Sequence, residues 1–512
     1  MNQLGALEPI SVRALLQAVL DDTSSLPAEL DTVSFLHLVT DSRDVQDGDA
    51  FIALQGTSAD GHQFAAKAVS DGARVVFQDT GSLCSDDVRV EHLDTYWLIS
   101  IPGLVECLPR LLHQRYLRAR DVQLLAVTGT NGKSSVTQYI AQLATMLNRP
   151  CGVIGTVGNG IWPNLKPTRN TTPGLAIVLR ILDEWARAGL ELAAVEVSSH
   201  GLDQGRVQGL TFATAALTNL TQDHLDYHGD MASYYQTKRR LFTEYGVQSA
   251  FINTDDPFGQ RLVTELPAAV SVVEFGAGTR ECNGEKRLFW HSESFDIASG
   301  INADISSPWG NGALTLPLIG GFNLSNATLA VAMLASLSMD FNQLLDAARH
   351  LEPVAGRMEL LVCPDKPSVI VDFAHTPDAL DNVLSALQQW NTPITLVFGC
   401  GGDRDRAKRP LMMEVALRQA DTIWLTDDNP RYENPDQIWS DALAVPGHEI
   451  VNCKHDREAA IQAAVMETAP GGLLVVAGKG HESTQDVQGQ KIPFSDLQVL
   501  KCMGYQRAGS DV

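Results

Sequence analysis

A glycine-rich segment with a lysine and two serines is the part of this chain best suited to hold phosphate. It reads Gly129-Thr130-Asn131-Gly132-Lys133-Ser134-Ser135. The segment follows an apolar run, 124–127, and a strand that enters such a turn presents backbone N–H groups and a helix N-terminus to phosphate oxygens. Lys133 would add a positive charge, and Ser134 or Ser135 would offer a hydroxyl to Mg²⁺. The segment therefore predicts a nucleoside triphosphate site.

The spacing of this segment differs from that of the usual phosphate loop. In the usual pattern, Gly-x-x-x-x-Gly-Lys-Ser/Thr, a longer stretch separates the first glycine from the Gly-Lys pair. Here only Thr130 and Asn131 intervene, and Val127 stands where the first glycine is expected. The segment alone is therefore also compatible with a tight strand-to-helix turn that contains a lysine by chance.

Carboxylate, hydroxyl and imidazole side chains follow two further apolar runs. The run 193–195 is followed by Glu196, Ser198, Ser199 and His200. Another run ends in the loop 219–229, which contains two aspartates and two histidines. Ligands bind where parallel strands end, and carboxylate oxygens are ligands that Mg²⁺ prefers. We therefore interpret Glu196 as a candidate metal ligand opposite the triphosphate.

Two of these features also have simpler interpretations. The run ending at Glu196 could surface into an ordinary polar loop. Lys238 lies in the helix-like stretch 234–241 beside two arginines, and judged by these neighbours it belongs to an exposed basic face.

The elements that must position these residues indicate three domains. The chain has 512 residues, whereas single cores stop growing at about 250 to 300 residues. With 44% hydrophobic and 19% charged residues, its composition is that of a globular protein. We predict an α/β protein with a small N-terminal α/β domain (1–108), a central ATPase domain with a mainly parallel sheet (109–353) and a C-terminal Rossmann-like domain (354–512).

Short apolar runs support this division. In the first domain we predict strands at 33–38, 50–54, 73–77 and 96–99 and a helix at 62–71, and a helix near 104–116 leads from this domain to the phosphate-loop strand. In the second, strands at 124–127, 193–196, 213–220 and 250–253 alternate with helices, β-structure with long turns covers Thr279–Pro317, and a helix extends from 321 to about 351. In the third we predict strands at 368–372, 395–398, 422–426, 449–451 and 472–477.

Charge and cysteine content exclude several classes of protein. The net charge of −23 argues against general binding of nucleic acid or anionic membranes. The eight cysteines are scattered, with no Cys-x-x-Cys pair or zinc spacing, which fits a reducing compartment. The first residues lack a secretory pattern, and no run of about 18 apolar residues occurs. We expect a cytoplasmic protein that does not insert into membranes.

In the order and spacing of its motifs, the chain resembles the Mur ligases over nearly its whole length. The motifs are Gly129–Ser134, Glu196–His200, Asn219–Gly229, Lys238, Asn253–Asp256, Gly321–Asn326, Gly356-Arg357 and Asp372–Pro377. Mur ligases are ATP-dependent, amide-forming enzymes of peptidoglycan precursor synthesis, with a UDP-binding domain, a central ATPase domain and a C-terminal Rossmann-like domain. Their own phosphate loop has the short form seen here.

The resemblance implies roles for residues of the central site. Lys133, Glu196, His224 and Lys238 would be catalytic, and Ser134, Glu196, His224 and Lys238 would hold Mg²⁺. The residues implied in ATP binding are Gly129, Thr130, Asn131, Gly132, Lys133, Ser134, Ser135, Asn323, Asn326, Arg357, Asp372 and His375. Lys238 matches the position that the family carbamylates to N6-carboxylysine, which reverses the interpretation of an exposed lysine. Phe373 stands where a tyrosine is common, so a hydroxyl contact there is not expected.

The resemblance also implies two substrate sites. Ser42, Thr171, Thr172, Ser198 and Arg206 would meet the UDP-MurNAc-dipeptide. Pro173 departs from the family pattern and removes one backbone N–H, but both threonine hydroxyls remain. Asp428-Asn429-Pro430-Arg431 looks like the motif of ligases that select meso-diaminopimelate, and the residues implied are Arg404, Asp428, Asn429, Arg431, Gly478 and Glu482.

The distal end of diaminopimelate is a zwitterion, which explains why such residues would be needed. An arginine can pair with its carboxylate, and an acid such as Glu482 can accept its ammonium group. A pocket for L-lysine would have little use for Arg431, because the far end of lysine carries no carboxylate.

The expected activity is ATP-dependent addition of meso-diaminopimelate to the D-glutamyl γ-carboxylate of UDP-MurNAc-L-Ala-D-Glu through an acyl phosphate, by a monomer. A sister Mur ligase that adds L-lysine or another residue, and a ligase like the folylpolyglutamate synthetases, are the alternatives. A nucleotide-binding module without enzymatic activity would keep the phosphate loop but would not need Glu196, His224 and Lys238.

Overall fold

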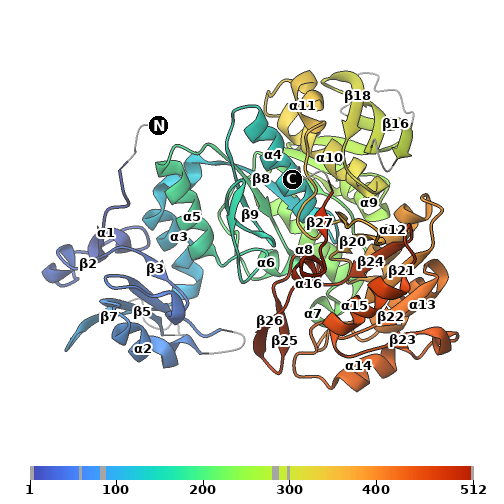
Figure 1. Cartoon of the computed structure of the whole chain (residues 1–512). Helices are drawn as coiled ribbons and strands as arrows, with labels where there is room; N and C mark the ends of the chain where they lie inside the picture. The colour runs from blue at the N-terminus through green and yellow to red at the C-terminus, as the bar shows by residue number, and fades with distance from the viewer. Residues whose placement is uncertain (1–4, 57–59, 81–87, 279–286, 297–299, 509–512) are drawn as a thin grey trace.

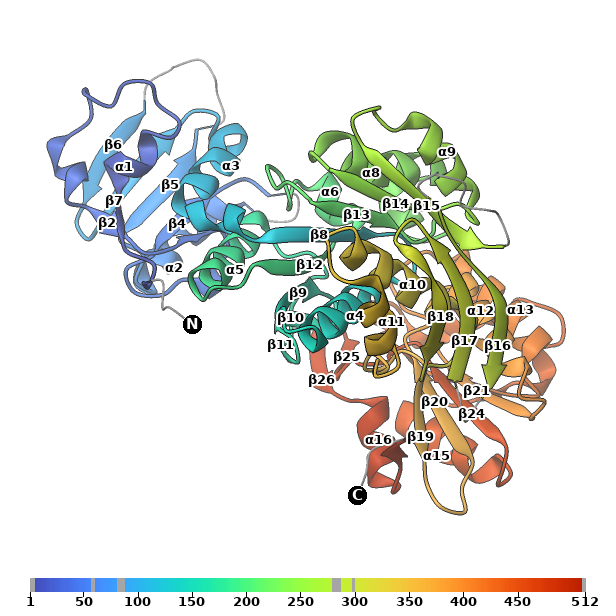
Figure 2. The same cartoon turned by 90° about the horizontal axis from the view of Figure 1, so that it is seen from above.

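Three bodies of secondary structure make up the molecule (Figure 1). The computed structural model describes residues 5–56, 60–80, 88–278, 287–296 and 300–508. The N-terminal body lies at one end, and the central and C-terminal bodies lie side by side in both views (Figures 1 and 2). In the part of the chain that is described, no helix combines the length and the apolar character needed to cross a membrane.

The N-terminal body is a small sheet with helices packed against it. Its strands are β1 (Ile10–Ser11), β2 (Ser34–Phe35), β3 (Leu38–Val39), β4 (Ala50–Ala53), β5 (Val75–Asp79), β6 (Arg89–Leu93) and β7 (Tyr96–Ile101). Its helices are α1 (Val12–Leu16), η1 (Ala28–Asp31), η2 (Ser42–Asp44), η3 (Gly61–Phe64), α2 (Ala65–Ser70), α3 (Leu104–Arg115) and η4 (Leu117–Asp121). The main sheet has the order β3-β4-β5-β7-β6, with β6 antiparallel at its edge.

One predicted strand of this body, 33–38, is wrong as a single element. β2 pairs with β1 in a separate sheet, and β3 belongs to the main sheet. Between them the N–H of His37 donates to the Asp49 carboxylate at 3.2 Å, so the backbone leaves the strand there.

The central body is built on one sheet of eleven strands. The first part of its chain contains β8 (Gln123–Thr128), α4 (Lys133–Met146), β9 (Cys151–Gly155), β10 (Gly158–Ile161), β11 (Asn164–Lys166), α5 (Leu175–Arg187), β12 (Leu192–Glu196), α6 (Ser199–Asp203), β13 (Thr214–Leu217), α7 (Leu225–His228) and α8 (Met231–Glu244). It continues with β14 (Ser249–Asn253), α9 (Pro257–Glu265), β15 (Ser271–Ala277), β16 (Arg287–Asp296), β17 (Gly300–Ser307), β18 (Gly310–Leu316), α10 (Gly321–Ala335) and α11 (Phe341–Ala348).

The sheet order is β11-β10-β9-β12-β8-β13-β14-β15-β16-β17-β18, so the phosphate-loop strand β8 lies in its interior. The seven strands from β9 to β16 in this order are parallel to one another. The pairs β9–β10 and β16–β17 are antiparallel. Helices α4 and α10 cover one face, and α8 and α9 the other (Figure 2). The prediction of a mainly parallel sheet with helices on both faces is confirmed.

Two predictions for the central body are modified. Helix 321–351 is interrupted after Ala335, because Ser338 has a φ of +64° and the Asp340 side chain caps a new helix, α11. The predicted β-structure at 279–317 is present as β16, β17 and β18, whereas residues 279–286 and 297–299 lie outside the described part of the chain.

The C-terminal body has a sheet of seven strands with the order β23-β22-β21-β24-β20-β19-β27. Its elements are β19 (Glu359–Val362), β20 (Ser368–Asp372), α12 (Pro377–Gln388), β21 (Ile394–Phe398), α13 (Lys408–Gln419), β22 (Thr422–Leu425), α14 (Pro435–Ala442), η5 (His448–Ile450), β23 (Asn452–Cys453), α15 (Arg457–Glu467), β24 (Leu473–Ala477), β25 (Thr484–Val487), β26 (Gln490–Pro493), α16 (Asp496–Cys502) and β27 (Gln506–Arg507). Strands β20 to β24 form the parallel core of this sheet.

The predicted strand at 449–451 is wrong. Gly447, with a φ of +89°, directly precedes the short helix η5, and the N–H of Val451 donates to the carbonyl of His448 at 3.0 Å. The strand follows immediately, as β23. The predicted domain boundaries stay predictions: the first lies within α3, and the second lies between α11 and β19.

Candidate active site

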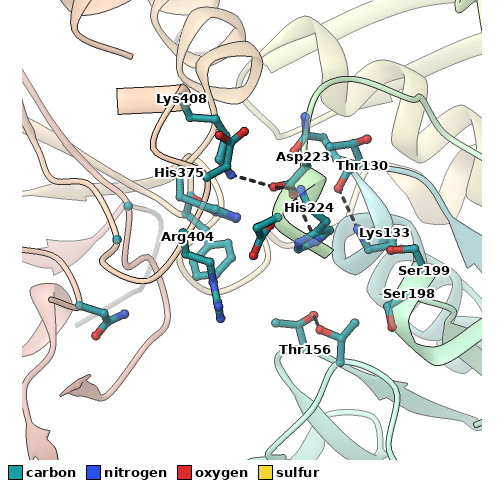
Figure 3. Close-up of a pocket in the computed structure, with 18 of the residues that line it drawn as sticks. Thr130, Lys133, Thr156, Ser198, Ser199, Asp223, His224, His375, Arg404 and Lys408 are labelled. Carbon is teal, nitrogen blue, oxygen red and sulfur yellow. Dashed lines mark hydrogen bonds and ion pairs between the residues drawn. The ribbon is translucent and has the colours of Figure 1, made fainter. Parts of the chain in front are cut away.

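A pocket of about 420 Å³ lies where strand ends of the central and C-terminal bodies face each other (Figure 3). Of the predicted site residues, it is lined by Thr130, Asn131, Gly132, Lys133, Ser134, Thr171, Glu196, Ser198, His224, Lys238, Arg357, His375, Arg404, Asp428, Asn429, Arg431, Gly478 and Glu482. The fold thus brings together residues that are up to three hundred and fifty positions apart in the sequence.

The phosphate loop is fixed between β8 and the loop that follows β13. The N–H of Thr130 donates to the carbonyl of Asn219 at 2.9 Å, and the N–H of Asn131 donates to the Asn219 side chain at 2.8 Å. Gly129 has a φ of +147°, and a side chain there would collide with Thr218. Lys133 begins α4, and its Nζ donates to the carbonyls of Gly129 and Thr130 at 2.9 and 2.7 Å. The loop is therefore pre-formed.

Glu196 ends β12 next to the loop and is 1% exposed. Its Oε2 accepts hydrogen bonds from Ser134 Oγ and Thr156 Oγ1, each at 3.0 Å, and its Oε1 accepts one from the N–H of Thr156 at 2.9 Å. A side chain at Gly155 would collide with this carboxylate and displace Glu196 from its present position. Oxygen atoms of Glu196 and Ser134 thus already lie close together beside the phosphate loop.

Lys238 is buried, which corrects the interpretation of an exposed basic face. It is 2% exposed, and its Nζ donates to the carbonyl of Gly129 at 2.9 Å. Burial and the neighbouring Lys133 ammonium lower the pKa of Lys238 well below its ordinary value. A neutral amine is the form that reacts with CO₂, so this environment favours carbamylation.

His224 adopts a strained backbone, with a φ of +54°. Its Nε2 lies 3.3 Å from Asp223 Oδ2, and Asp223 Oδ1 accepts a hydrogen bond from Lys408 Nζ at 2.8 Å (Figure 3). Burial, together with His200 and the two nearby lysines, lowers the pKa of His224 to about 3. The imidazole is therefore neutral at pH 7, as a metal ligand must be.

Arg357 brings a half-buried guanidinium to the same pocket. It stacks on the ring of Phe373 at 4.5 Å, and its Nε has no hydrogen-bond partner among the residues described. An unpaired, buried N–H of this kind suits an anionic ligand. His375 lines the pocket and bonds through Nδ1 to the carbonyl of Phe373 at 2.8 Å.

Some predicted nucleotide-binding residues lie behind the pocket surface. They are Gly129, Ser135, Asn323, Asn326 and Asp372. Asp372 accepts hydrogen bonds from the N–H groups of Met358 and Ala374 at 2.7 and 2.8 Å, and Asn323 accepts one from Tyr139 at 3.0 Å. These residues lie where they can support the residues that line the pocket. Their contact with ATP remains a prediction.

Charged groups at the far end of the pocket come from the C-terminal body. Arg431 has a φ of +54°, and its Nη1 donates to the carbonyl of Gly402 at 2.6 Å. Burial and the Arg404 guanidinium lower the pKa of Arg431. Two neighbouring guanidinium groups therefore favour an anion between them.

Carboxylates lie beside these guanidinium groups. Burial opposes ionisation of Glu482, but the Lys479 ammonium and hydrogen bonds hold the pKa of this carboxyl below its ordinary value. Asp428 Oδ2 is buried without a partner among the residues described, and a side chain at Gly478 would lie 2.7 Å from it. The far end of the pocket thus presents both positively and negatively charged side chains to a ligand.

A second pocket, of about 820 Å³, lies between η2 and the segment from β10 to α5. Arg169 lines both pockets and pairs with Asp41 and Asp44 of the N-terminal body at 3.3 and 3.4 Å. Ser42 is buried in η2, between residues that line the second pocket.

The predicted residues of the peptide site form one network. Thr171 Oγ1 lies 3.0 Å from Thr156 Oγ1, Thr172 Oγ1 donates to the carbonyl of Glu196 at 2.7 Å, and Arg206 Nη1 donates to the carbonyl of Thr172 at 2.8 Å. Ser198 Oγ lies 3.0 Å from Thr172 Oγ1. Thr171 and Ser198 line the first pocket, and Thr172 and Arg206 support them from behind.

Sequence reasoning missed several lining residues, chiefly Thr156, Arg169, Asp223 and Lys408. Thr156 directly follows the buried strand β9 and could have been found by the rule that ligands bind where parallel strands end. Arg169 and Lys408 carry no local signal, because their partners belong to other bodies of the structure.

Without modification of Lys238, the side chains beside the phosphate loop provide only part of a binding site for Mg²⁺. No cluster of three or more His, Cys, Asp or Glu residues that could hold a metal is found in the described ranges. Ser134 and Glu196 offer oxygen atoms, and a carbamate on Lys238 would add two more, which is the ligand chemistry that Mg²⁺ prefers. The residues therefore fit the ion if Lys238 is carbamylated.

Three family models match the chain. The model described as "Mur ligase family, catalytic domain" matches residues 35–95. "Mur ligase middle domain" matches residues 127–334, and "Mur ligase, glutamate ligase domain" matches residues 356–480. These segments fall on the three bodies of Figure 1.

Curated relatives match at nearly full length. The UDP-N-acetylmuramoyl-L-alanyl-D-glutamate--2,6-diaminopimelate ligase of Neisseria meningitidis serogroup A / serotype 4A is 41% identical over 474 residues, covering 90% of this chain and 93% of the relative. The protein of the same name from Vibrio parahaemolyticus serotype O3:K6 is 41% identical over 491 residues, covering 95% of this chain and 97% of the relative.

Solved structures also match. A UDP-N-acetylmuramoyl-L-alanyl-D-glutamate--2,6-diaminopimelate ligase aligns with a TM-score of 0.64 at 32% identity, covering 97% of this chain and 98% of that one. MurF from Acinetobacter baumannii aligns with a TM-score of 0.66 at 18% identity, covering 92% and 96%, which shows a likeness of fold.

Proposed function

The chain belongs to the Mur ligase family, and we propose that it joins meso-diaminopimelate to the D-glutamyl γ-carboxylate of UDP-MurNAc-L-Ala-D-Glu at the expense of ATP. One observation carries this proposal: the phosphate loop with Lys133 and the charged cluster around Arg431 and Glu482 line the same pocket. The pocket thus offers places for a triphosphate and for a zwitterionic amino acid within reach of each other.

The first step activates a carboxylate. An oxygen of the D-glutamyl γ-carboxylate attacks the γ-phosphorus of ATP, the bond to the β-phosphate oxygen breaks, and ADP leaves an acyl phosphate behind. Because two anions must approach each other, the step needs concentrated positive charge. Lys133 and the unpaired N–H of Arg357 supply such charge from the pocket walls.

Mg²⁺ held by Ser134, Glu196, His224 and carbamylated Lys238 would further neutralise phosphate charge. Before carbamylation, the Lys238 ammonium would repel the ion, which is why the modification belongs to the proposal.

The second step forms the amide. The amine of diaminopimelate attacks the acyl carbon, the resulting tetrahedral intermediate expels inorganic phosphate, and the nitrogen loses a proton. For this reaction the amine must be held near the acyl carbon, and orientation of this kind contributes strongly to rate. Arg404 and Arg431 bind the distal carboxylate, and Glu482 and Asp428 accept the distal ammonium.

The nucleotide-sugar substrate extends across both pockets. Its peptide end contacts Thr171 and Ser198 in the first pocket, and its UDP end reaches Ser42 and its neighbours at the second. Arg169 supports this path, since it lines both pockets.

The same proposal includes the cytoplasm as the site of action and a monomer as the working form. Cys107, Cys151, Cys363, Cys400, Cys453 and Cys502 are unpaired, as in proteins of reducing compartments. Residues of a single chain line both pockets, so a second copy is not needed to complete them.

Phosphate release tests the activity. The protein is incubated with ATP, Mg²⁺ and UDP-MurNAc-L-Ala-D-Glu, and meso-diaminopimelate, L-lysine or glutamate is added in turn. We expect release to be stimulated most strongly by diaminopimelate, because only this amino acid presents a distal carboxylate and a distal ammonium together.

Two results would contradict parts of the proposal separately. Faster release with L-lysine would refute the role of Arg431 and point to a sister ligase. No stimulation by any of the amino acids would refute the ligase activity itself and leave a nucleotide-binding module.

A further inference from the structure

A fully buried lysine lies directly behind the charged cluster of the amino-acid pocket. Lys479 is 0% exposed, and its Nζ donates to Asn429 Oδ1 at 3.0 Å and to Glu482 Oε2 at 2.8 Å. Burying an ammonium group is costly unless it is paired and hydrogen-bonded. These two contacts satisfy that need, so the three side chains form one unit.

The lysine fixes which way the Asn429 amide faces. Asn429 Oδ1 accepts from both Lys479 Nζ and the N–H of Asp486, the latter at 2.9 Å. An ammonium and an N–H can only donate, so the oxygen must face them. The amide nitrogen then faces Glu482 and donates to its Oε2 at 2.9 Å.

As a result, the two oxygens of Glu482 have different surroundings. Oε2 accepts from Lys479 and Asn429, whereas no donor to Oε1 is found among the residues described. Glu482 lines the pocket, and its side chain is 32% exposed. The carboxylate is thus held by one oxygen and presents the other to a ligand.

We propose that Lys479 is a positioning residue for amino-acid selectivity: it holds Asn429 and Glu482 so that one carboxylate oxygen of Glu482 receives the distal ammonium of diaminopimelate. This inference rests on the proposed function. Lys479 lies behind the pocket and touches no substrate, so it acts only through the two side chains that it orients.

A pair of ligands separates this role from a general structural one. Diaminopimelate is compared with L-2-aminopimelate, which keeps both carboxylates and the reacting amine but lacks the distal amine. KM and kcat are measured for both amino acids with the wild-type enzyme, Lys479→Met and Lys479→Gln. Such a cycle isolates the coupling between the lysine and one group of the ligand.

We expect the wild-type enzyme to favour diaminopimelate, and the preference to fall about 10-fold or more in both variants, since a charge-assisted hydrogen-bond network is lost. The change should appear as a higher KM for diaminopimelate, while the KM for ATP and kcat at saturating amino acid stay within about threefold of wild type.

Lys491→Met is the matched control. It is the same substitution on the hairpin β25–β26 of the same body, but the Lys491 side chain is 65% exposed and pairs with the Asp486 carboxylate. We expect this variant to keep the wild-type preference for diaminopimelate.

The inference is overturned if both ligands lose affinity by the same factor in the Lys479 variants, which would indicate a structural role. It is also overturned if wild-type enzyme uses both amino acids equally well. If Lys479→Met does not fold, Lys479→Gln gives the same comparison. Absence of any wild-type activity with diaminopimelate would instead refute the proposed function.

Discussion

Two lysines, Lys133 and Lys238, lie close enough in the catalytic pocket for each to affect the other. Lys238 is almost fully buried, and nearby Lys133 disfavours its charged form. Two ammonium groups in such a place repel each other, whereas an ammonium and a carbamate attract. Carbamylation, as proposed, would therefore remove an unfavourable interaction and at the same time create a ligand for a cation.

Replacing Lys238 tests this role. Lys238→Ala should lose nearly all ligase activity, because the oxygen atoms of the carbamate disappear, and acetate or another short carboxylic acid should restore part of it by entering the space left behind. Activity is measured by phosphate release over a series of acetate concentrations.

Arg240→Ala is the control for that experiment. Arg240 lies on the same helix, α8, but pairs with Glu244 at the surface. It should keep wild-type activity and gain nothing from acetate. A fully active Lys238→Ala enzyme would show that the metal site does not need this residue.

Residue types and spacing predicted which groups meet in the pocket, including Lys133, Glu196 and His224. The burial of Lys238 was missed when its neighbours alone were considered. The helical spacing would have predicted its burial, because Tyr234, Lys238 and Phe242 are four residues apart and share the buried face of α8. Lys479, between two glycines, has no such pattern, and its role follows only from three-dimensional contacts.

At the scale of elements, a small hairpin holds Arg431 in place. Strands β25 and β26 form it, and the N–H of Arg431 donates to the carbonyl of Asp486 at 2.9 Å, while the N–H of Gln488 donates to the carbonyl of Arg431 at 2.6 Å. The left-handed backbone at Arg431 is thus held from both sides. A change that moves the backbone of the hairpin turn should therefore affect amino-acid binding first.

A glycine in the turn of this hairpin allows a matched comparison. Gly489 has a φ of +76°, and Gly471, in the same body but before β24, has a φ of +84° with open space around it. Alanine at either position costs about 1 to 2 kcal/mol of backbone strain. We expect Gly489→Ala to raise the KM for diaminopimelate by about 5-fold, and Gly471→Ala to lower only the melting temperature.

Steady-state kinetics and thermal melts of both variants check this prediction. An unchanged KM in Gly489→Ala, with the same loss of thermal stability as in Gly471→Ala, would mean that the hairpin does not control Arg431.

Much of the element order could be predicted from apolar runs, because buried parallel strands such as β20 (Ser368–Asp372) are short and uninterrupted. Errors arose where side chains redirect the backbone. The Asp49 carboxylate interrupts the predicted strand 33–38, and the Asp340 cap divides the predicted helix 321–351. The edge strand β6 was not predicted, since its exposed residues give no apolar pattern.

At the scale of the whole molecule, polar contacts hold the central and C-terminal bodies together over the pocket. The Lys408–Asp223 pair joins them at 2.8 Å, with side chains 10% and 7% exposed. Asn131 of the phosphate loop donates to the Asp378 carboxylate at 2.9 Å. Burial opposes ionisation of Asp223, but the Lys408 ammonium and its hydrogen bond to the carboxylate hold the pKa of Asp223 well below its ordinary value. The arrangement is therefore a closed one.

Removing one partner of the buried pair should favour opening. Lys408→Met leaves the Asp223 carboxylate without a cationic partner, which costs about 3 to 5 kcal/mol while it stays buried, and separation of the two bodies would return the carboxylate to water. We expect a larger radius of gyration in small-angle X-ray scattering and a lower kcat.

The double variant Asp223→Asn/Lys408→Met should recover the compact form, since no unpaired charge remains, although its kcat should stay low because His224 loses its partner. Lys366→Met, which alters a surface lysine of the C-terminal body, is the control and should scatter like wild type. A compact Lys408→Met protein would show that other contacts suffice for closure.

The chain of contacts around Arg431, Asn429, Lys479 and Glu482 lies wholly within the C-terminal body. The phosphate loop, Glu196 and Lys238 lie wholly within the central one. The proposed choice of amino acid and the proposed activation of the carboxylate therefore depend on different bodies of the protein, and each can change in evolution without the other. Substitutions in the C-terminal body alone could then change which amino acid is added to the peptide, while the central body that uses ATP remains the same.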